Sequence, residues 1–365
     1  MSPKKKTLSL SNNVLPEELK RKFVEKLMKW NKESNVRKMP WKGEKNPYKI
    51  WISEIILQQT RVEQGLKYYE KFIKAFPTVE ALADAPQEQV FKLWEGLGYY
   101  SRCRNLIETA QFIAANEKGV FPKDYHSILQ LKGVGQYTAS AIASFAYNLP
   151  HAVLDGNVFR VLSRIFDIEI AIDSAEGKKH FTELAQNILP VKNAGEYNQA
   201  IMDFGAVICK PYPECKSCYL NNYCRAYKLG KQDLLPIKCK KIKIKERWLN
   251  YFIVRHKGKV LLRKRISNDI WQQLFEFVLI ETDKQYKEEK LLRLFSKQYN
   301  ILGYNHKPLP DTKQKLTHQI INFSFQEIEL KNKQTIVGFT WVNCNELKEY
   351  PFPKSLQELV VSSLK

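Results

Sequence analysis

Four of the seven cysteines lie in one short stretch, and their spacing restricts the chain more than any other feature. The stretch runs Cys209-x5-Cys215-x2-Cys218-x5-Cys224, and the remaining cysteines, Cys103, Cys239 and Cys344, stand alone. An odd number of cysteines with one tight cluster does not indicate a secreted disulfide framework. Four thiolates this close together can hold a structural zinc ion or a 4Fe-4S cluster, and spacing alone does not choose between them. We therefore predict a metal centre in a reducing compartment.

The charge balance indicates the class of partner. Lysine and arginine number 59 against 38 aspartates and glutamates, which gives a formal net charge of +21. Such an excess favours approach to a polyanion before any specific contact forms. Nucleic acid is therefore the first candidate partner, and an anionic membrane surface is the second. No uninterrupted apolar run approaches the roughly 20 residues of a membrane helix. We expect residues 1–14 to form a basic flexible tail rather than a secretory signal.

The pattern of apolar residues divides the chain into three parts. Residues 15–227 show helical spacing almost throughout, as in Phe23, Leu27 and Trp30, and predict an all-α region. Residues 228–247 are rich in lysine and predict a basic linker, which is either a solvated tether or a segment that follows DNA. Residues 248–365 predict a mixed α and β domain. Its strands are expected at 251–254, 260–262, 275–280, 320–330 and 336–342, and its helix near 288–299.

A glycine-rich turn lies between two predicted helices. Residues 131–135 (LKGVG) follow an apolar segment at 127–131 and precede a helix at 136–147. Two glycines allow a tight hairpin whose backbone N–H groups can hold a phosphate without reading the base sequence. Taken alone, this is equally well an ordinary turn between helices. The high positive charge and the metal loop favour the DNA-binding interpretation.

Two carboxylates occupy positions suited to acid and anion chemistry. Glu54 lies among apolar neighbours on a predicted helix, where desolvation would raise its pKa toward that of a general acid. A glutamate on a solvated helix face is the simpler alternative. Asp155 precedes a helical run, where it can cap the helix and remain ionised. A protonated and an ionised carboxyl together are the pair used at glycosidic carbons.

With these residues in view, the chain resembles the helix-hairpin-helix glycosylases of the endonuclease III and MutY group, and within it the adenine glycosylase (MutY) branch. The resemblance covers nearly the whole chain. It rests on motifs in family order: RKMPW (37–41), SEIILQQT (53–60), WEGLGYYSR (94–102), LKGVG (131–135), LDGNV (154–158) and the cysteine loop. The family fold implies a six-helix barrel at 46–146 with the helix-hairpin-helix. It also implies an iron–sulfur cluster domain formed by 15–45 and 147–227.

The resemblance implies catalytic roles. Glu54 would protonate adenine mispaired with 8-oxoguanine or guanine and later position water, after the base is flipped from the duplex. Asp155 would stabilise the oxocarbenium-like sugar, with support from Asn157 and Tyr137. Members of the endonuclease III branch carry a nucleophilic lysine where this chain has Tyr137. Since tyrosine cannot form a Schiff base, the implied enzyme is monofunctional, with little strand cleavage.

The resemblance also implies DNA contacts and a cofactor. Gln59 and Tyr99 would insert into the duplex at the mispair, where planar side chains replace lost stacking. The complete implied DNA-binding set is Trp41, Lys42, Gln58, Gln59, Thr60, Tyr99, Lys132, Gly133, Val134 and Gly135. Cys209, Cys215, Cys218 and Cys224 would hold a 4Fe-4S cluster.

Two positions depart from the family pattern. The first cysteine spacing is x5 where the family has x6, which puts the loop geometry and cluster stability in doubt. Lys42 stands where many members carry arginine or glutamine, which puts its contact with the flipped adenine in doubt.

The C-terminal domain resembles the MutT-like (Nudix-fold) domain with which this family recognises 8-oxoguanine. It lacks the closely spaced glutamates of a Nudix box, which a nucleotide pyrophosphatase would need to bind magnesium. Thr317 and His318 fall at the family's 8-oxoguanine recognition loop, and a polar strand end is the alternative interpretation of these two residues.

Two other functions compete with the adenine glycosylase. An endonuclease III-like glycosylase/lyase on damaged pyrimidines is disfavoured by Tyr137 and by the C-terminal domain. A non-catalytic damage-sensing protein would need neither Glu54 nor Asp155. We expect a monomer that binds double-stranded DNA containing 8-oxoguanine:A or G:A mispairs, is cytoplasmic (bacterial, nucleoid-associated) and has no membrane association.

Overall fold

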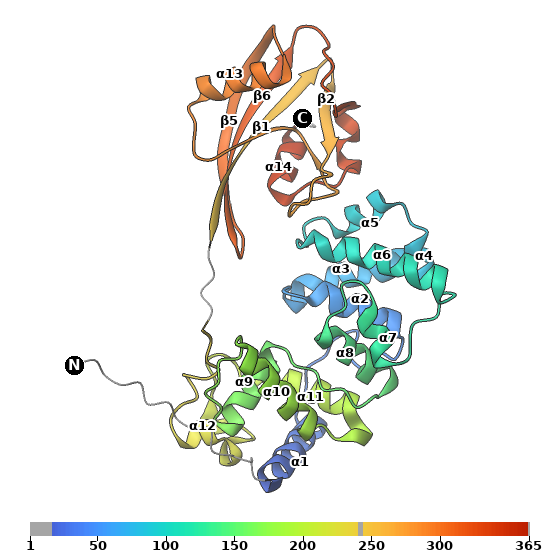
Figure 1. Cartoon of the computed structure of the whole chain (residues 1–365), viewed down its shortest axis with the longest axis vertical. Helices are drawn as coiled ribbons and strands as arrows, with labels where there is room; N and C mark the ends of the chain where they lie inside the picture. The colour runs from blue at the N-terminus through green and yellow to red at the C-terminus, as the bar shows by residue number, and fades with distance from the viewer. Residues whose placement is uncertain (1–16, 240–243, 364–365) are drawn as a thin grey trace, which may run out of the picture. The chain divides into compact units, whose positions relative to one another are not determined.

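The computed structural model describes residues 17–239 and 244–363 (Figure 1). The chain divides into two compact units. The first comprises Met1–Glu54 and Phe121–Lys240, and the second comprises Ile55–Val120 and Lys241–Lys365. These units do not follow the sequence-predicted ranges, because residues 55–120 group with the C-terminal domain and not with the rest of the predicted barrel. Those ranges stay predictions.

The first unit is helical in its described part. Its helices are α1 (Glu17–Glu33), the start of α2 (Pro47–Leu57), α7 (Tyr125–Gln130), α8 (Gln136–Tyr147), α9 (Gly156–Phe166), α10 (Ala175–Ile188), α11 (Ala194–Val207) and α12 (Arg225–Lys228). Single 3-10 turns at Val191–Asn193, Cys215–Ser217 and Asn221–Tyr223 join them. Helix α1 buries Phe23, Leu27 and Trp30 at spacings of four and three, which places all three on one face.

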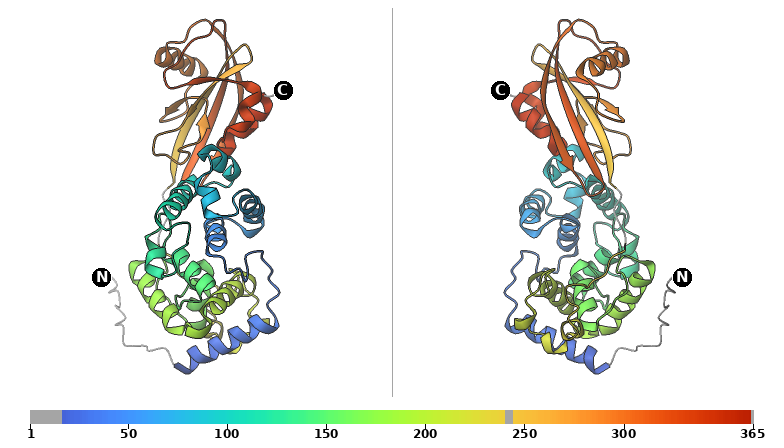
Figure 2. Two further views of the ribbon diagram at one scale, coloured as in Figure 1. Left: turned by 90° about the vertical axis from the view of Figure 1, so that its right-hand side faces the viewer. Right: turned by 90° about the vertical axis from the view of Figure 1, so that its left-hand side faces the viewer.

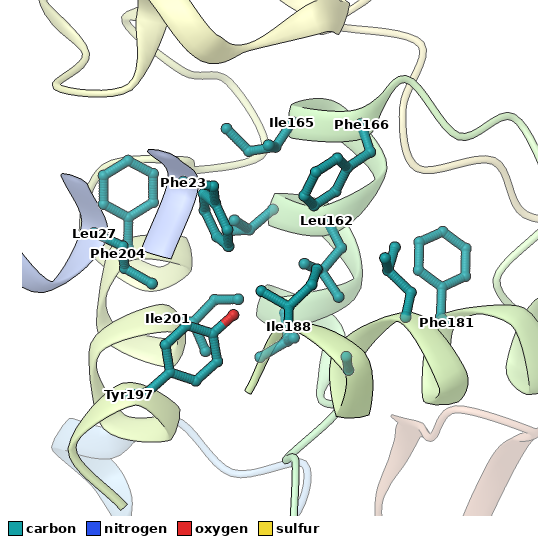
Figure 3. Close-up of a cluster of buried hydrophobic side chains, with 14 of the residues drawn as sticks. Phe23, Leu27, Leu162, Ile165, Phe166, Phe181, Ile188, Tyr197, Ile201 and Phe204 are labelled. Atoms are coloured by element: carbon teal, nitrogen blue, oxygen red, sulfur yellow. The ribbon is translucent and has the colours of Figure 1, made fainter. Parts of the chain in front are cut away.

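A single apolar core holds α1, α9, α10 and α11 together (Figure 3). Phe23 of α1 packs edge-on against Phe166 of α9, with 5.8 Å between ring centroids. Trp30 packs in the same manner against Phe204 of α11 at 5.0 Å. Aromatic pairs in this geometry gain about 1 kcal/mol beyond the apolar area that they bury. These contacts therefore hold α9 and α11 against α1.

A glycine permits the closest approach in this core. A Cβ at Gly205 of α11 would lie 2.7 Å from the Cβ of Asn157 and 2.9 Å from its carbonyl oxygen. Helix α11 can therefore pack against the first turn of α9 only with glycine at this position.

The second unit joins helices to the C-terminal domain. After the last turn of α2 come α3 (Val62–Ala75), α4 (Val79–Ala83), α5 (Gln87–Trp94) and α6 (Tyr100–Asn116). The C-terminal domain contains β1 (Lys245–His256), β2 (Lys259–Lys264), β3 (Phe275–Glu276), β4 (Val278–Thr282), α13 (Glu288–Tyr299), β5 (Tyr304–Lys315), β6 (Gln319–Leu330), β7 (Thr340–Asn343), a 3-10 turn (Cys344–Glu349) and α14 (Lys354–Ser363).

The strands form one mixed sheet. Its main order is β3-β2-β1-β6-β5, with β4 also paired to β1 and β7 to β2. Strands β1 and β6 are parallel, and the other pairs are antiparallel. Alternate residues of β1 face opposite sides of the sheet. Phe252 stacks on Phe295 of α13, whereas its neighbour Tyr251 stacks with Phe323 and Phe325 on the other side. Figure 2 shows α13 and α14 on opposite faces of the sheet.

The structure agrees with much of the predicted secondary structure. The helical region, the helices that flank the 131–135 turn and the helix at 288–299 are confirmed. The strand predicted at 336–342 is β7 at Thr340–Asn343, so its first four residues were assigned wrongly. Strand β5 and helix α14 were missed. Strand β5 contains Pro308 and Pro310, which are tolerated there because it is an edge strand.

The structure describes both ends of the predicted basic linker at 228–247, and the linker itself stays a prediction. Strand β1 already begins at Lys245. Residues 229–239 are anchored on the first unit: Leu235 is buried, and Arg164 donates to its carbonyl oxygen at 3.0 Å. The Ile237 carbonyl accepts the N–H of Ile172 at 3.0 Å. Residues 240–243 and the tail at 1–14 lie outside the described residues. Over the described ranges, none of the helices has the length and hydropathy that a bilayer span requires.

We predict that Gly205→Ala lowers the free energy of unfolding by about 1–2 kcal/mol, because overpacking of a tight helix contact outweighs the helix propensity of alanine. Denaturant titration measures the change. Gly156→Ala is the control, since a Cβ at Gly156 meets no atom within 4 Å, and it should change stability by less than about 0.5 kcal/mol. Equal effects of the two substitutions would refute the role of the close approach.

Candidate active site

Glu54 is a buried carboxyl in the middle of α2. Its relative exposure is 6%, and the adjacent Ser53 and Ile55 are also buried. The pKa of Glu54 is raised to about 7, mainly by burial; a hydrogen bond with Tyr137 opposes the shift, and the nearby Asp155 carboxylate adds to it. The solvated alternative for Glu54 is therefore wrong. A carboxyl with this pKa can donate and regain a proton near neutral pH.

Asp155 caps the N-terminus of α9. Its Oδ1 accepts the backbone N–H groups of Asn157 at 2.9 Å and Val158 at 2.8 Å, and its Oδ2 accepts from the Asn157 side-chain amide at 2.8 Å. Burial raises the pKa of Asp155, while these hydrogen bonds and the Arg160 charge lower it. Donors at a helix N-terminus favour the carboxylate. The capping role and an anionic role therefore coexist.

Tyr137 links the two carboxyls to the hairpin, because it lies in the first turn of α8. Its hydroxyl hydrogen-bonds with Glu54 and lies 4.0 Å from the sulfur of Met202. Burial, followed by the two carboxylates, raises the pKa of Tyr137 well above its ordinary value, so the phenol stays neutral. Tyr137 is a hydrogen-bond donor, and it has no amine that could form a Schiff base.

Sequence reasoning missed Arg160, which joins Asp155 to the cysteine loop. Arg160 Nη2 donates to Asn157 Oδ1 and to the Gly205 carbonyl, both at 2.8 Å, and its Nε donates to the Cys209 carbonyl at 2.7 Å. Asn157, held in this way, donates to Asp155. The sequence does contain a signal for this role, because Arg160 lies four residues before Arg164 on a mostly apolar helix. A guanidinium group that is drawn into such surroundings requires hydrogen-bond partners.

The four clustered cysteines converge in the structure. Together with Arg164, Phe204 and other residues of the first unit, Cys209, Cys215, Cys218 and Cys224 line one cavity. Within the ranges 17–239 and 244–363, no three His, Cys, Asp or Glu side chains are arranged to hold a single metal ion. A zinc ion needs four sulfur atoms at about 2.3 Å. The four thiols supply one thiolate for each iron of a 4Fe-4S cluster, so the residues present fit that group.

The surroundings of the thiols fit this group. Arg164 Nη1 donates to Cys209 Sγ at 3.5 Å, and the Leu220 N–H donates to Cys218 Sγ at 3.4 Å. Burial raises the pKa of Cys218 to about 11 and that of Cys224 to about 12. Thiolates here therefore require a bound cation.

The predicted hairpin has the expected backbone. Gly133 has a φ of +78°, which favours glycine, and Gly135 is the N-cap residue of α8. Val134 is buried and holds the turn, whereas Lys132, Gly133 and Gly135 are exposed. The first N–H groups of α8 have no acceptor within the helix, which makes this end suited to a phosphate.

The residues expected to insert into DNA lie on two strained turns of the second unit. Gln59 follows α2 with a φ of +55°, and Tyr99 precedes α6 with a φ of +49°. Both side chains are exposed. A left-handed backbone at a residue other than glycine costs about 1 kcal/mol and is frequent at functional sites. Gln58 and Thr60 flank the first turn.

The loop that is predicted to recognise 8-oxoguanine contacts one of these turns. The Tyr99 hydroxyl lies 3.0 Å from Thr317 Oγ1. Tyr99, Thr317 and His318 line a pocket of the second unit with Trp271 and Gln314. Thr317 and His318 lie between the end of β5 and the start of β6, so the strand-end alternative stays open beside the recognition role. The His318 carbonyl accepts the Lys245 N–H at 2.9 Å, which fixes the end of the loop to β1.

Trp41 and Lys42 have a different environment from the other predicted DNA contacts. Trp41 is buried with a relative exposure of 8%. The Lys42 ammonium is 2.9 Å from Asp203, a fully buried carboxylate that also pairs with Arg37 at 2.8 Å. The pair holds the loop after α1 against α11. Contact of Trp41 or Lys42 with DNA stays a prediction.

The chain matches two family models. One is described as an HhH-GPD superfamily base excision DNA repair protein and covers residues 52–187. The other is described as a NUDIX domain and covers residues 250–361. The two matches confirm the predicted glycosylase core and MutT-like domain.

Whole proteins are also similar to this chain. An adenine DNA glycosylase of Buchnera aphidicola subsp. Baizongia pistaciae is 40% identical over 259 residues, which are 70% of this chain and 73% of the relative. That of the subspecies Schizaphis graminum is 30% identical over 346 residues, 93% of this chain and 97% of the relative. A solved structure of a thermostable thymine-DNA glycosylase has a TM-score of 0.53 at 28% identity and covers 58% of this chain and 98% of its own.

We predict that Glu54→Gln stabilises the protein at pH 8. A carboxyl whose pKa rises from 4.5 unfolded to about 7 folded contributes full stability below pH 4.5. That contribution is lost as the pH rises through 7. Glutamine has no proton to lose, so the unfolding free energy of the variant should exceed that of the parent by about 3 kcal/mol at pH 8 and by little at pH 4.5. Exposed Glu63→Gln is the control. A pH-independent difference would refute the buried-acid assignment.

Proposed function

The chain belongs to the adenine DNA glycosylase family of base excision repair, and on that premise we propose that it excises adenine mispaired with 8-oxoguanine or guanine. One observation carries the proposed mechanism. Glu54, with a pKa raised to about 7, lies beside Asp155, whose three hydrogen bonds favour the carboxylate. This pairs a proton donor with an anion at one site.

The first step breaks the bond between adenine and the sugar. Adenine flipped out of the duplex receives the Glu54 proton on a ring nitrogen, and the electron pair of the C1′–N bond leaves with the base. Tyr137, neutral and hydrogen-bonded with Glu54, orients the carboxyl. The sugar becomes an oxocarbenium-like cation.

The second step restores the enzyme. The Asp155 carboxylate lowers the free energy of the sugar cation by electrostatic attraction, which is strong where water is excluded. Water adds to C1′, and its proton returns to Glu54. Because position 137 holds tyrosine, no Schiff base forms there and the DNA strand remains intact. The enzyme is therefore monofunctional.

Recognition of the opposite base is assigned to the second unit. Tyr99 touches Thr317, and the pocket that they share with His318 presents hydroxyl and imidazole groups to a polar base edge. The net charge of +21 and the hairpin at 131–135 support binding of the duplex backbone. We propose that the protein acts as a monomer on the nucleoid of a bacterial cytoplasm.

Cys209, Cys215, Cys218 and Cys224 would hold a 4Fe-4S cluster. When bound, the cluster would cross-link the loop between α11 and α12 and neutralise the four thiolates. Arg164 then serves as a hydrogen-bond donor to one thiolate. Arg160 donates to both the Cys209 carbonyl and the Asn157 side chain, so it links the positions of these two residues.

The excision reaction is tested with a single-turnover assay on a duplex with 8-oxoguanine opposite adenine. Strand breaks should arise only after alkali, and the rate should fall as the pH rises through 7 because Glu54 loses its proton. Glu54→Gln should reduce the rate by about a thousandfold, with duplex binding nearly unchanged. Glu63→Gln is the matched control. An active Glu54→Gln enzyme would refute the assignment of Glu54 as the acid. Breaks without alkali would indicate lyase chemistry, and no product from cluster-loaded protein would indicate a damage sensor.

The recognition pocket generates a separate prediction. Thr317→Ala combined with His318→Ala should reduce the preference for 8-oxoguanine:A over G:A by about tenfold, since loss of specific hydrogen bonds costs about 1–3 kcal/mol. Rates on both duplexes measure this preference. Thr312→Ala is the control, because Thr312 is exposed and lies on β5, before the loop that contains Thr317 and His318. Equal loss on the two duplexes would contradict the assignment.

A further inference from the structure

We propose that Arg102 is a positioning residue that fixes the Gln59 and Tyr99 turns as one element, so that both side chains enter the duplex together. The inference rests on the proposed function of these two residues. Arg102 itself has a relative exposure of only 8%, so its role is to act through the turns and not on DNA.

The guanidinium group of Arg102 connects the two turns directly. Its Nη1 donates to the carbonyls of Ile55 at 2.7 Å, Ile56 at 2.9 Å and Gln58 at 2.7 Å. Its Nη2 donates to the Gly98 carbonyl at 3.2 Å. Gln58 and Gly98 immediately precede Gln59 and Tyr99. One side chain thus holds the residue before each inserting side chain.

The same group supports the Tyr99 ring. The Arg102 guanidinium carbon lies 5.3 Å from the Tyr99 ring centroid and 5.4 Å from that of Trp94. Trp94 is fully buried, and its indole N–H donates to the Gly98 carbonyl at 3.1 Å. A partly desolvated cation over an aromatic face is attracted by the negative charge density of the ring. The Tyr99 ring therefore packs on the buried Arg102 guanidinium group, while its hydroxyl contacts Thr317.

Strain explains why such a device is needed. Gln59 and Tyr99 both have positive φ values, and without support their turns would relax toward the ordinary right-handed or extended regions. The carbonyls of Ile55 and Ile56 at the end of α2 lack helical partners, and they attract the cation. Burial lowers the pKa of Arg102 to about 10, so it remains charged at neutral pH. Lysine has no planar fork to span several carbonyls.

The test is a double-mutant cycle between Arg102→Lys and the pair Gln59→Ala with Tyr99→Ala. Binding is measured on an 8-oxoguanine:A duplex and on a fully paired duplex, in a Glu54→Gln background that prevents excision. A 2-aminopurine next to the mispair reports unstacking. We expect Arg102→Lys to reduce the preference for the mispair by about tenfold and to suppress the fluorescence rise, with binding to paired DNA unchanged. In the Gln59→Ala/Tyr99→Ala background it should cause no further loss.

Controls separate the possible outcomes. Arg61→Lys, an exposed arginine beside the first turn, should leave both signals intact. Additive losses in the cycle, or a preference unchanged by Arg102→Lys, would overturn the positioning role. Full mispair preference in Gln59→Ala/Tyr99→Ala would instead overturn the insertion roles of the proposed function. Thermal melting checks folding, and Arg102→Gln, which retains a planar donor, replaces the lysine variant if that variant does not fold.

Discussion

The catalytic architecture depends on the two arginines of α9. Arg160 holds Asn157 on one side and the Cys209 carbonyl on the other, and Arg164 donates to the carbonyls of Lys210, Pro211 and Leu235. The N-terminus of the same helix supplies the N–H groups that hold Asp155. Helix α9 therefore connects the cysteine loop to Asp155, the carboxyl that we propose as the anion of the active site. A disturbance at either end is transmitted along a chain of direct hydrogen bonds.

The two carboxyls differ in role because their environments differ. Asp155 has donors directed at both oxygens, whereas Glu54 has apolar neighbours and one phenol. Burial raises the pKa of both carboxyls; the hydrogen bonds to Asp155 oppose that rise more than the single Tyr137 hydrogen bond does at Glu54. The proposed acid role of Glu54 requires a buried ionisable side chain. Such a side chain makes the protein less stable at neutral pH than an uncharged side chain at that position would.

Local signals made much of this structure predictable, and long-range contacts did not. Helices such as α1 and α13 follow from apolar spacing, and the 131–135 hairpin follows from its glycines and from the helices on either side. Sequence alone could place Glu54 on a helix and Asp155 at a helix start. It could not show that Arg102 is buried and Arg160 half-buried, because a cation on an apolar helix resembles a surface residue until its carbonyl partners are known. The contact of Tyr99 with Thr317 joins residues 218 positions apart, and no local pattern encodes it.

Strand β5 shows how composition that weakens a strand can serve the molecule. Pro308 and Pro310 remove two backbone donors, the register shifts between Leu309 and Thr312, and Lys307, Lys313 and Lys315 are exposed along it. Prolines, bulges and lysines at a sheet edge discourage pairing with another chain. The irregular β5 therefore offers no regular row of backbone donors to which a strand of another chain could add.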